Sequence, residues 1–500
     1  MENARQRTIL FLIADTGAGH RSAANAIHSA LRIIEQEEQE AWQARQQSWV
    51  ASRSGGVYAQ STQDDAAPQV PSGSLSQTQT SQFPPPGYRV EIVDVFEEYS
   101  RFPLREAVKL YGPTIRYNPK LFGEVFHMSN RAETVEAFNT VATPLIQNGL
   151  LRLFTTVQPD VIVSIHPLLN RVSIQALREL GLPVPFITVV TDLITIHYSW
   201  FAEGADCYIV PTEEAKQLYL QRGLDPKKVH MLGMPIDPKF THPVASKHEL
   251  RERFGLRPDL PVVLLVGGGD GAGGLQTAVR AISHARLPVQ LLVVTGRNRT
   301  LYAHLQRTHA SLHVPAKIFG FVHNMPELMH ASDVIVTKAG PGTICEALCC
   351  NLPIILSGYV PGQEEGNVDF VVGNKVGVMA HDPVELVDAI RRYIKPGSPE
   401  RKVQQENALR LCRSRASFDI AHCILSYLPP ADAPGPWQSA RWRRRQQKMS
   451  GRLRSAIRLR RIRRRLSKPL LKGSVMERLA HLRIQSLSNR RSIPPIDRKS

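Results

Sequence analysis

A recurring unit constrains this chain most: a short, uninterrupted apolar run, then a turn, then a stretch with helical spacing. The run Thr8–Ala14 shows no alternation of apolar and polar residues, and Ala24, Ile27, Leu31 and Ile34 follow at helical spacing. Continuous apolar strands are typical of parallel sheets, which are buried on both faces. The unit therefore predicts a doubly wound α/β fold.

The unit recurs on both sides of a Pro-containing segment, Gly233–Pro243, which we interpret as a linker. A chain of 500 residues exceeds what one hydrophobic core usually supports. We expect two Rossmann-like domains facing across a cleft, residues 1–235 and 236–428, with a helical stretch at roughly 400–427 closing the second. Ligands bind such sheets beyond the carboxyl ends of the strands, so the cleft is the expected site. The other strand-like runs are Val90–Val93, Val161–Ile165, Phe186–Val190, Cys207–Val210, Val262–Val266, Gln290–Val294, Lys317–Phe319, Val334–Val336 and Ile354–Leu356.

Two segments differ in composition from these domains. Residues 36–87 are rich in Gln, Ser, Ala and Pro, which predicts a disordered insertion. Residues 441–500 hold 21 of the 62 Lys and Arg residues but only two of the 44 acids, so the net charge of +18 belongs to this tail. We treat residues 429–500 as a hinge followed by a basic tail.

The basic tail has three possible roles. Trp442, Met449, Leu453 and Ile457 fall near one face of a possible helix, which predicts binding to an anionic lipid surface. Nucleic acid is the rival partner, since Arg-rich segments also neutralise phosphates. We expect no nucleic acid, because no aromatic stacking platform accompanies the arginines; a solvated, disordered tail is the third alternative. The sequence contains no apolar run long enough to cross a bilayer and no signal-peptide pattern at its start.

The six cysteines form no C-x-x-C pair, which predicts reduced, mostly buried thiols. No His/Cys/Asp cluster has zinc spacing, and no D-x-D motif occurs. We therefore expect chemistry without a metal or other cofactor.

The first candidate site is the loop Asp15–His20. Gly17 and Gly19 allow a sharp turn and close approach to a ligand. His20 stands at the start of the following helix, where an imidazole with an ordinary pKa near ~6.5 suits a general base. The alternative is a simple strand-to-helix turn with a capping histidine.

Two candidate phosphate loops lie in the second half. In the glycine-rich segment Gly267–Gly274, backbone N–H groups at Gly268 and Gly269 suit a phosphate; the alternative is a flexible turn. In the segment from Lys338 to Ala347, Gly342 and Thr343 suit a pyrophosphate at a helix start, and Glu346 suits the two hydroxyls of a ribose. The alternative for Glu346 is a solvated surface position.

A fourth loop runs from Gly362 to Asn367. Its side chains Gln363, Glu364 and Asn367 combine amides with a carboxylate, which suits bidentate recognition of sugar hydroxyls. The alternative is a polar helix cap.

Taken in chain order, these motifs resemble monogalactosyldiacylglycerol synthase and its bacterial relatives. The matching stretches cover residues 8–34 and 88–425. They are Thr16–His20, Val189–Leu193 with His197 and Trp200–Phe201, Gly267–Asp270, Gly320–Val322, Lys338–Ala347 and Gly362–Asn367. The resemblance implies the GT-B fold, which that family shares with the peptidoglycan transferase that glycosylates lipid I.

The resemblance also implies a function. An inverting enzyme would move a hexose from UDP-galactose or UDP-glucose, bound by the second domain, to diacylglycerol, bound by the first. It would be peripheral on the cytoplasmic face of the membrane. Alternatives are another lipid acceptor, polyprenyl-linked or sterol, or a non-catalytic membrane- or nucleic-acid-binding protein on a degenerate transferase core.

Site roles follow residue by residue from the resemblance. His20 would be the base; mechanistic reasoning, rather than the resemblance, adds Asp192 or Asp94 as the group that orients it. Phe321 and Val322 would border the uracil, Glu346 would hold the ribose, and Gln363, Glu364 and Asn367 would contact the sugar. The acceptor side would consist of Gly17, Gly19, Asp192 and His197.

One stretch mixes apolar and basic residues, from Arg101 to Asn130. This mixture suits a surface that lies on a lipid bilayer. An ordinary buried helix pair would have a similar composition.

Overall fold

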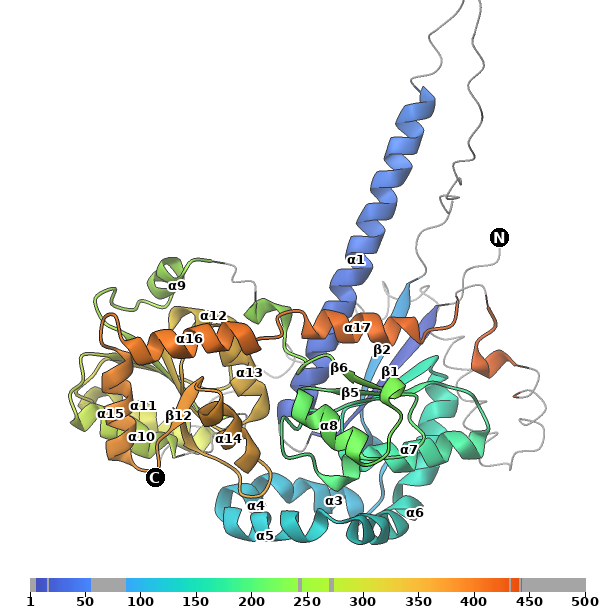
Figure 1. The fold of residues 1–500 in the computed structure, drawn as a ribbon, viewed down its shortest axis with the longest axis horizontal. Coiled ribbons are helices and arrows are strands. Elements are labelled where there is room, and N and C mark those ends of the chain that lie inside the picture. The colour runs from blue at the N-terminus through green and yellow to red at the C-terminus, as the bar shows by residue number, and fades with distance from the viewer. Residues whose placement is uncertain are drawn as a thin grey trace, which may run out of the picture.

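The computed structural model describes residues 6–15, 18–54, 87–241, 245–268, 274–430, 433–439 and 442. They form two parallel sheets with helices on both faces, side by side (Figure 1). The expected pair of doubly wound domains is thereby confirmed. Gly17, Gly269, most of the basic tail and residues 55–86 lie outside the described residues.

The N-terminal sheet has the order β2-β1-β3-β4-β5-β6. Its order reverses between β1 and β3, so the loops that follow these two strands diverge at one point of the sheet edge. The three-residue edge strand β6 was not predicted. The strands are β1 (Arg7–Ile13), β2 (Tyr88–Asp94), β3 (Val161–Ser164), β4 (Phe186–Val189), β5 (Cys207–Val210) and β6 (Val229–Met231).

The C-terminal sheet has the order β12-β11-β10-β7-β8-β9 and reverses between β7 and β10. The Gly267 loop follows β7 and the Ala339–Pro341 loop follows β10. The strands are β7 (Val262–Val266), β8 (Gln290–Val294), β9 (Ala316–Phe319), β10 (Val334–Lys338), β11 (Ile354–Gly358) and β12 (Gly377–Met379).

Helices cover both faces of each sheet (Figure 1). In the first half they are α1 (Ala18–Ser54), α2 (Val95–Tyr99), α3 (Leu104–Lys109), α4 (Tyr111–Tyr117), α5 (Pro119–Ser129), α6 (Ala132–Val157), α7 (Pro167–Leu180) and α8 (Glu213–Gln221). In the second half they are α9 (Lys247–Arg253), α10 (Leu275–His284), α11 (Arg299–Thr308), α12 (Met325–Ala331), α13 (Pro341–Cys349), α14 (Glu365–Gly373), α15 (Pro383–Tyr393), α16 (Pro399–Leu411) and α17 (Ala416–Ser426). Short 3-10 turns are η1 (Tyr198–Trp200), η2 (Pro226–Lys228), η3 (Pro238–Phe240), η4 (His309–Ser311) and η5 (Pro436–Gln438).

The strands are apolar throughout because each side of a sheet is covered. In β1, Leu10 and Leu12 point into the core under α6 and α7, while Ile9, Phe11 and Ile13 join the core formed with α1 and α17. Alternate residues of a strand face opposite sides, so a strand with helices on both sides needs apolar residues at every position. The continuous runs in the sequence have this cause.

The expected disordered insertion is wrong over residues 36–54, because α1 continues through them to Ser54. This part of α1 projects away from both domains (Figure 1). Its Glu, Gln, Ala and Arg residues have high helix propensity, which sustains a helix even without packing on both sides. A polar composition suits an exposed helix as well as a disordered segment.

The C-terminal boundary of the second domain also differs from the expectation. The helical stretch is two helices, and α17 crosses back to the first domain, where Ile420, Ala421 and Ile424 join the core beside α1. The hydroxyl of Ser417 donates to the carbonyl of Ile236 at 2.6 Å, so the returning chain contacts the first linker. Residues 416–428 therefore pack with the N-terminal domain rather than closing the C-terminal one.

Two tryptophans follow this crossing. Trp437 and Trp442 are buried in the core under the N-terminal sheet, with ring centroids 5.0 Å apart, and the Trp437 indole donates to the Pro159 carbonyl at 2.7 Å. Trp442 was expected on the lipid-facing side of an amphipathic helix. That expectation is wrong for Trp442, since its side chain is covered by protein.

The expectation that all six thiols are reduced is wrong for one pair. Cys349, at the end of α13, forms a disulfide with Cys412, just beyond α16, with Cα atoms 5.2 Å apart. The two cysteines are 63 residues apart, so only the packing of these helices reveals the pairing. The other four cysteines are free thiols. In the described part of the chain, no helix is both long enough and apolar enough to span a bilayer.

Candidate functional site

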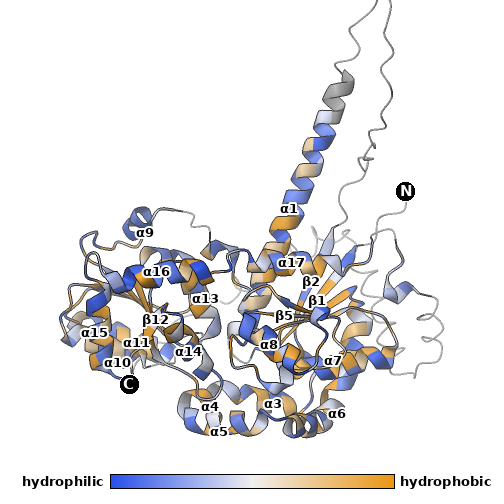
Figure 2. Ribbon diagram, viewed as in Figure 1, coloured by the Kyte–Doolittle hydropathy of each residue, from blue (hydrophilic) through white to orange (hydrophobic). Residues whose placement is uncertain are grey.

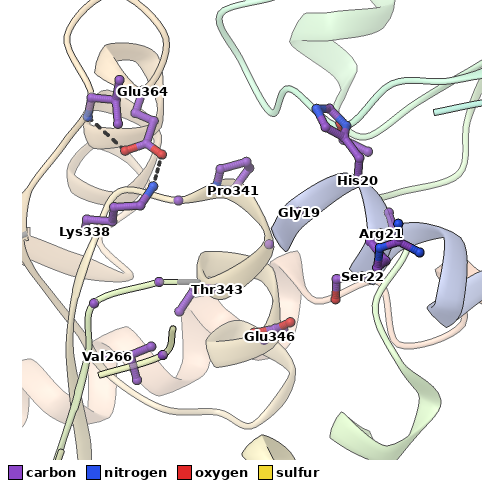
Figure 3. Close-up of a pocket in the computed structure, with 18 of the residues that line it drawn as sticks. Gly19, His20, Arg21, Ser22, Val266, Lys338, Pro341, Thr343, Glu346 and Glu364 are labelled. Atoms are coloured by element: carbon purple, nitrogen blue, oxygen red, sulfur yellow. Dashed lines mark hydrogen bonds and ion pairs between the residues drawn. The ribbon is translucent and has the colours of Figure 1, made fainter. Parts of the chain in front are cut away.

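A cavity of about 400 Å³ lies between the two sheets and is lined by residues from both domains. Its walls include the start of α1 on one side and the loops after β7 and β10 on the other (Figure 3). These loops are the points where the strand order of each sheet reverses, and open α/β sheets bind ligands there. The site therefore lies where the points of strand-order reversal in the two sheets face each other.

His20 stands on the first turn of α1 and faces this cavity (Figure 3). Its Nδ1 lies 3.2 Å from the Thr191 hydroxyl, its ring hydrogen-bonds to the Ile165 carbonyl, and the His166 ring meets it edge-on at 4.7 Å. Burial lowers the pKa of His20 to about 4; the Ile165 carbonyl and the Asp15 charge partly offset this effect. The imidazole is therefore neutral at pH 7 and able to accept a proton.

Neither acid expected to orient His20 contacts its ring. Asp94 caps α2 through Glu97 N and accepts from the backbone N–H of Asp15 at 2.8 Å. The carboxylate of Asp192 accepts from the Trp200 indole at 2.7 Å, and burial raises the pKa of Asp192 to about 6. The groups that hold the His20 ring are a hydroxyl and a backbone carbonyl instead.

The opposite wall suits an anion. Helix α13 begins at Pro341 with no side chain capping it, so the first-turn N–H groups near Gly342 and Thr343 are available at the positive end of the helix dipole. Lys338 passes beneath Gly268, where a Cβ would lie 3.1 Å from the lysine Cε. A helix start and an ammonium group together form a site for a diphosphate.

Glu346 lies one turn into α13, on the wall of the same cavity (Figure 3). Burial, followed by the charge of Asp237, raises the pKa of Glu346 to about 7. Such a carboxyl group is only half ionised at neutral pH, and a ligand that donates hydrogen bonds to it stabilises its ionised form. This favours the predicted contact with a diol over a solvated surface position.

The loop between β11 and α14 contributes Gln363 and Glu364 to the cavity. Glu364 is buried, and both carboxylate oxygens have protein partners: Lys338 Nζ at Oε1, and the backbone N–H of Val360 at Oε2, 2.9 Å away (Figure 3). Asn367 does not line the cavity; its side chain is buried and donates to the Ala339 carbonyl at 2.9 Å. Of the three side chains predicted to contact the sugar, Gln363 and Glu364 line the cavity. Glu364 is held in an ion pair with Lys338, whereas Gln363 is uncharged.

Phe321 and Val322 line the cavity where the loop after β9 reaches it. The Arg297 guanidinium stands 5.5 Å from the centre of the Phe321 ring and 3.9 Å from Asp15 of the other domain. Phe321 is half exposed, so a flat base could stack on it.

His197 is separate from the cavity. Its ring lies between the hydroxyls of Ser129 and Ser199, at 3.2 and 2.7 Å, and meets the Phe126 ring at 4.9 Å. Burial lowers its pKa to about 4. His197 thus connects α5 to η1 and lies behind the site rather than in it.

Several residues in or beside the cavity had no predicted role, although Thr191 and Lys338 lie in stretches that the sequence analysis singled out. Thr191 and His166 follow strands β4 and β3, Arg297 follows β8, and Lys338 ends β10. Their signal was their position directly after a parallel strand, which the prediction used only for glycine-rich loops. Tyr111 also lines the cavity, but it begins helix α4, which follows another helix rather than a strand, so it had no such signal. Among the described residues, no group of three or more His, Cys, Asp or Glu side chains could hold a metal ion.

Two protein-family profiles match the chain. The profile described as "Monogalactosyldiacylglycerol (MGDG) synthase" matches residues 74–236, and the profile "Glycosyltransferase family 28 C-terminal domain" matches residues 262–417. The boundary between the two matches falls in the region of the linker between the sheets.

Similar known proteins extend over most of the chain. The "Probable monogalactosyldiacylglycerol synthase 2, chloroplastic" of Oryza sativa subsp. japonica is 35% identical over 433 residues, which are 85% of this chain and 81% of the relative. "Monogalactosyldiacylglycerol synthase 3, chloroplastic" of Arabidopsis thaliana is 34% identical over 84% of this chain and 81% of the relative. A solved structure of S. aureus MnaA with UDP has a TM-score of 0.50 at 15% identity, covering 86% of this chain and 100% of that one. This last similarity is one of fold, and it accords with the expected GT-B class.

Proposed function

The chain belongs to the monogalactosyldiacylglycerol synthase family of glycosyltransferases, and on this premise we propose that it transfers a galactosyl group from UDP-galactose to 1,2-diacylglycerol. We propose galactose rather than glucose because the relatives are named for galactose. The observation that carries the proposal is one cavity that joins the His20 end of the first sheet to the uncapped start of α13 and Glu346 in the second.

The reaction in this proposal is a single displacement. The Phe321 side, Glu346 and the first turn of α13 receive the uracil, the ribose and the diphosphate. Neutral His20 takes the proton from the free hydroxyl of diacylglycerol while that oxygen forms its bond to C1 of the sugar. The bond from C1 to the diphosphate oxygen breaks with its electron pair, UDP leaves on the opposite face, and the anomeric centre inverts to a β-glycoside.

Stabilisation of the leaving group is assigned to the protein alone. The dipole of α13 and the Lys338 ammonium oppose the charge that develops on the diphosphate. We therefore propose that no metal or other cofactor takes part. Activity that is unchanged after dialysis against a chelator supports this part, and activity restored only by a divalent cation contradicts it.

The central test is a transfer assay with the purified full-length chain. Liposomes containing diacylglycerol are incubated with labelled UDP-galactose, UDP-glucose or UDP-N-acetylglucosamine, and the lipid product is identified by chromatography. A galactolipid from UDP-galactose is the expected result. Parallel liposomes with a polyprenyl phosphate or a sterol separate the acceptor classes; no lipid product from any combination overturns the proposal.

A diacylglycerol acceptor requires peripheral contact with a bilayer, and helices α3–α6 carry the features of such a surface. In Figure 2 these helices lie along one edge of the molecule, with hydrophobic segments among polar ones. Phe102 and Tyr117 are 78% and 80% exposed, and the exposed bases Arg105, Lys109 and Lys120 lie among them, the first two in ion pairs with Glu106 and Glu97. The other exposed apolar residues here are Leu110, Leu121, Val125, Met128, Phe138 and Val141. Apolar side chains interspersed with bases suit the interface of an anionic bilayer.

Liposome sedimentation tests this surface. The double variant Leu121→Asp/Val125→Asp is expected to bind vesicles of anionic lipid at least tenfold more weakly than the parent chain, because two carboxylates would enter the interface. Val384→Asp is the matched control, since Val384 is 70% exposed on α15 of the other domain. Equal binding of the two variants contradicts the assignment.

The basic tail beyond Trp442 lies outside the described residues, and we propose that it adds electrostatic attraction to anionic lipid. Deletion of residues 443–500 is expected to make vesicle binding less sensitive to salt. We also place the enzyme on the cytoplasmic face, although the relatives above are described as chloroplastic. Cell fractionation with protease protection of the intact membranes decides the compartment and the side.

A further inference from the structure

Tyr111 and Gln363 make a contact across the cleft that the transfer reaction described above does not use. Tyr111 opens α4 in the N-terminal domain, and its hydroxyl donates to Oε1 of Gln363 in the C-terminal domain at 2.8 Å. Both side chains line the cavity. The two residues belong to different domains, so the contact depends on how the domains are placed relative to each other.

The other end of the same amide is also held by the N-terminal domain. The carboxylate of Asp192 accepts a hydrogen bond from the Gln363 side chain, while also accepting from the Trp200 indole. A carboxylate accepts only from the amide nitrogen, and the tyrosine donates to the amide oxygen. The two partners therefore agree on one orientation of the Gln363 amide.

The loop that carries Gln363 is in tight contact with α5. At Gly362 the backbone has φ +76°, and a Cβ there would lie 2.8 Å from the Phe126 ring. At Gly123 of α5 a Cβ would lie 2.7 Å from the Cβ of Pro361. Both close approaches are between α5 and the loop, and α4 packs against α5, so packing sets the position of Tyr111. The Phe122 ring of α5 is nearly perpendicular to the Tyr111 ring of α4, with the ring centroids 5.4 Å apart, and supports it.

We propose that Tyr111 is a positioning residue that fixes the side-chain amide of Gln363 for the hexose of the donor. This inference rests on the proposed function. In it, the start of α4 in the acceptor-side domain completes the sugar subsite. Gln363 can meet a hydroxyl pair with one donor and one acceptor only if its amide has a single orientation. Loss of the Tyr111 hydroxyl releases one end of the amide and weakens its contact with the sugar, while the nucleotide keeps all its partners.

The test compares binding of UDP with binding of UDP-galactose by calorimetry, without any lipid acceptor. Tyr111→Phe is expected to weaken UDP-galactose about three- to tenfold, the effect of one hydrogen bond between neutral groups, and to leave UDP within about twofold. Tyr302→Phe is the matched control. It removes a tyrosine hydroxyl that also pairs with a glutamine, Gln306 at 3.2 Å, on α11 away from the cavity lining.

A double-mutant cycle separates positioning from direct contact. If Tyr111 acts through Gln363, the Tyr111→Phe change is expected to have no further effect on UDP-galactose binding in a Gln363→Ala background. An undiminished effect in that background overturns the inference. It is equally overturned if Tyr111→Phe behaves like Tyr302→Phe, or if Gln363→Ala leaves UDP-galactose affinity unchanged.

The outcome is independent of lipid transfer. A chain that binds UDP-galactose with the expected cycle but makes no glycolipid overturns the proposed function and supports the role of Tyr111. A chain that makes the glycolipid but lacks the expected double-mutant result supports the proposed function and overturns the role of Tyr111.

Discussion

At the scale of single residues, the two sides of the cavity differ in how they control protonation. His20 is kept neutral by burial, with its pKa lowered to about 4, and a hydroxyl and a carbonyl hold its ring. Glu346 is kept partly protonated, with its pKa raised to about 7. Because burial disfavours the charged form of either group, it moves the two pKa values in opposite directions.

The role of His20 predicts a separation of catalysis from binding. His20→Ala is expected to lower kcat by about 10²- to 10⁴-fold, the usual contribution of a general base, because the acceptor hydroxyl loses its proton acceptor. UDP-galactose affinity should stay within about twofold. His28→Ala, on the same helix but outside the cavity lining, is the control. Single-turnover rates and calorimetry give the two quantities; a weakened donor with an unchanged rate would contradict the assignment.

The raised pKa of Glu346 predicts a pH dependence of donor binding. The ionised carboxylate accepts hydrogen bonds from the ribose, so the protonated form below pH 7 has to release its proton on binding. UDP-galactose affinity is expected to rise about tenfold from pH 6 to pH 8. Each phosphate of this donor has one ester and one anhydride linkage, so it keeps a single strongly acidic group that does not titrate in that range. Glu346→Gln should bind more weakly at pH 8 and lose most of this slope, leaving the part near pH 6 where Asp192, the partner of Gln363, titrates; an identical slope in both proteins would refute the contribution of Glu346.

At the scale of elements, the loop between β11 and α14 depends on a backbone conformation that only glycine adopts easily. Gly362 combines φ +76° with the close Phe126 ring, whereas at Gly373, at the end of α14, an added Cβ would have no atom within 4 Å. The two glycines lie at either end of one short segment. Their environments therefore predict opposite effects of the same substitution.

Gly362→Ala is expected to lower the free energy of unfolding by about 1 to 3 kcal/mol, since it adds a left-handed penalty to a steric overlap. It should also raise the KM for UDP-galactose, because Gln363 is the next residue. Gly373→Ala should leave KM unchanged and stabilise by up to about 1 kcal/mol through helix propensity. Thermal unfolding and donor titration measure both effects. Two variants of equal stability would show that α5 does not press on this loop.

At the scale of the whole molecule, the chain passes between the domains twice. The second crossing brings α17 and the two tryptophans back to the N-terminal domain, so that both chain crossings meet at the Ser417–Ile236 contact. The two domains thus contact each other at this crossing and, across the cleft, through α4 and α5.

The buried tryptophans predict that the segment after α17 is part of the fold. Trp437→Ala is expected to cost about 3 to 5 kcal/mol of stability, because a large side chain leaves the core and the Pro159 carbonyl loses its partner. Trp437→Phe should cost clearly less, since it keeps most of the apolar volume. Denaturant unfolding measures the difference. If both variants unfold like the parent chain, the segment is not anchored in this core.

Much of the architecture was predictable because its causes are local. The strands Cys207–Val210, Val262–Val266 and Gln290–Val294 have the bounds expected from their apolar runs. The glycine-rich loops and helix starts also lie where a parallel strand ends. The short edge strands β6 and β12 were missed, because three residues carry too little pattern.

The sequence by itself determined the two sheets, the cleft between them and part of its lining, including His20, Glu346 and Gln363. These features depend on periodicity and on chemistry within a few residues of a strand end. Only the tertiary structure decided that Cys349 meets Cys412, that α17 returns to the first domain, and that Tyr111 reaches Gln363. Each of these contacts joins segments far apart in the chain, and local patterns carry no information about which distant surfaces pack together.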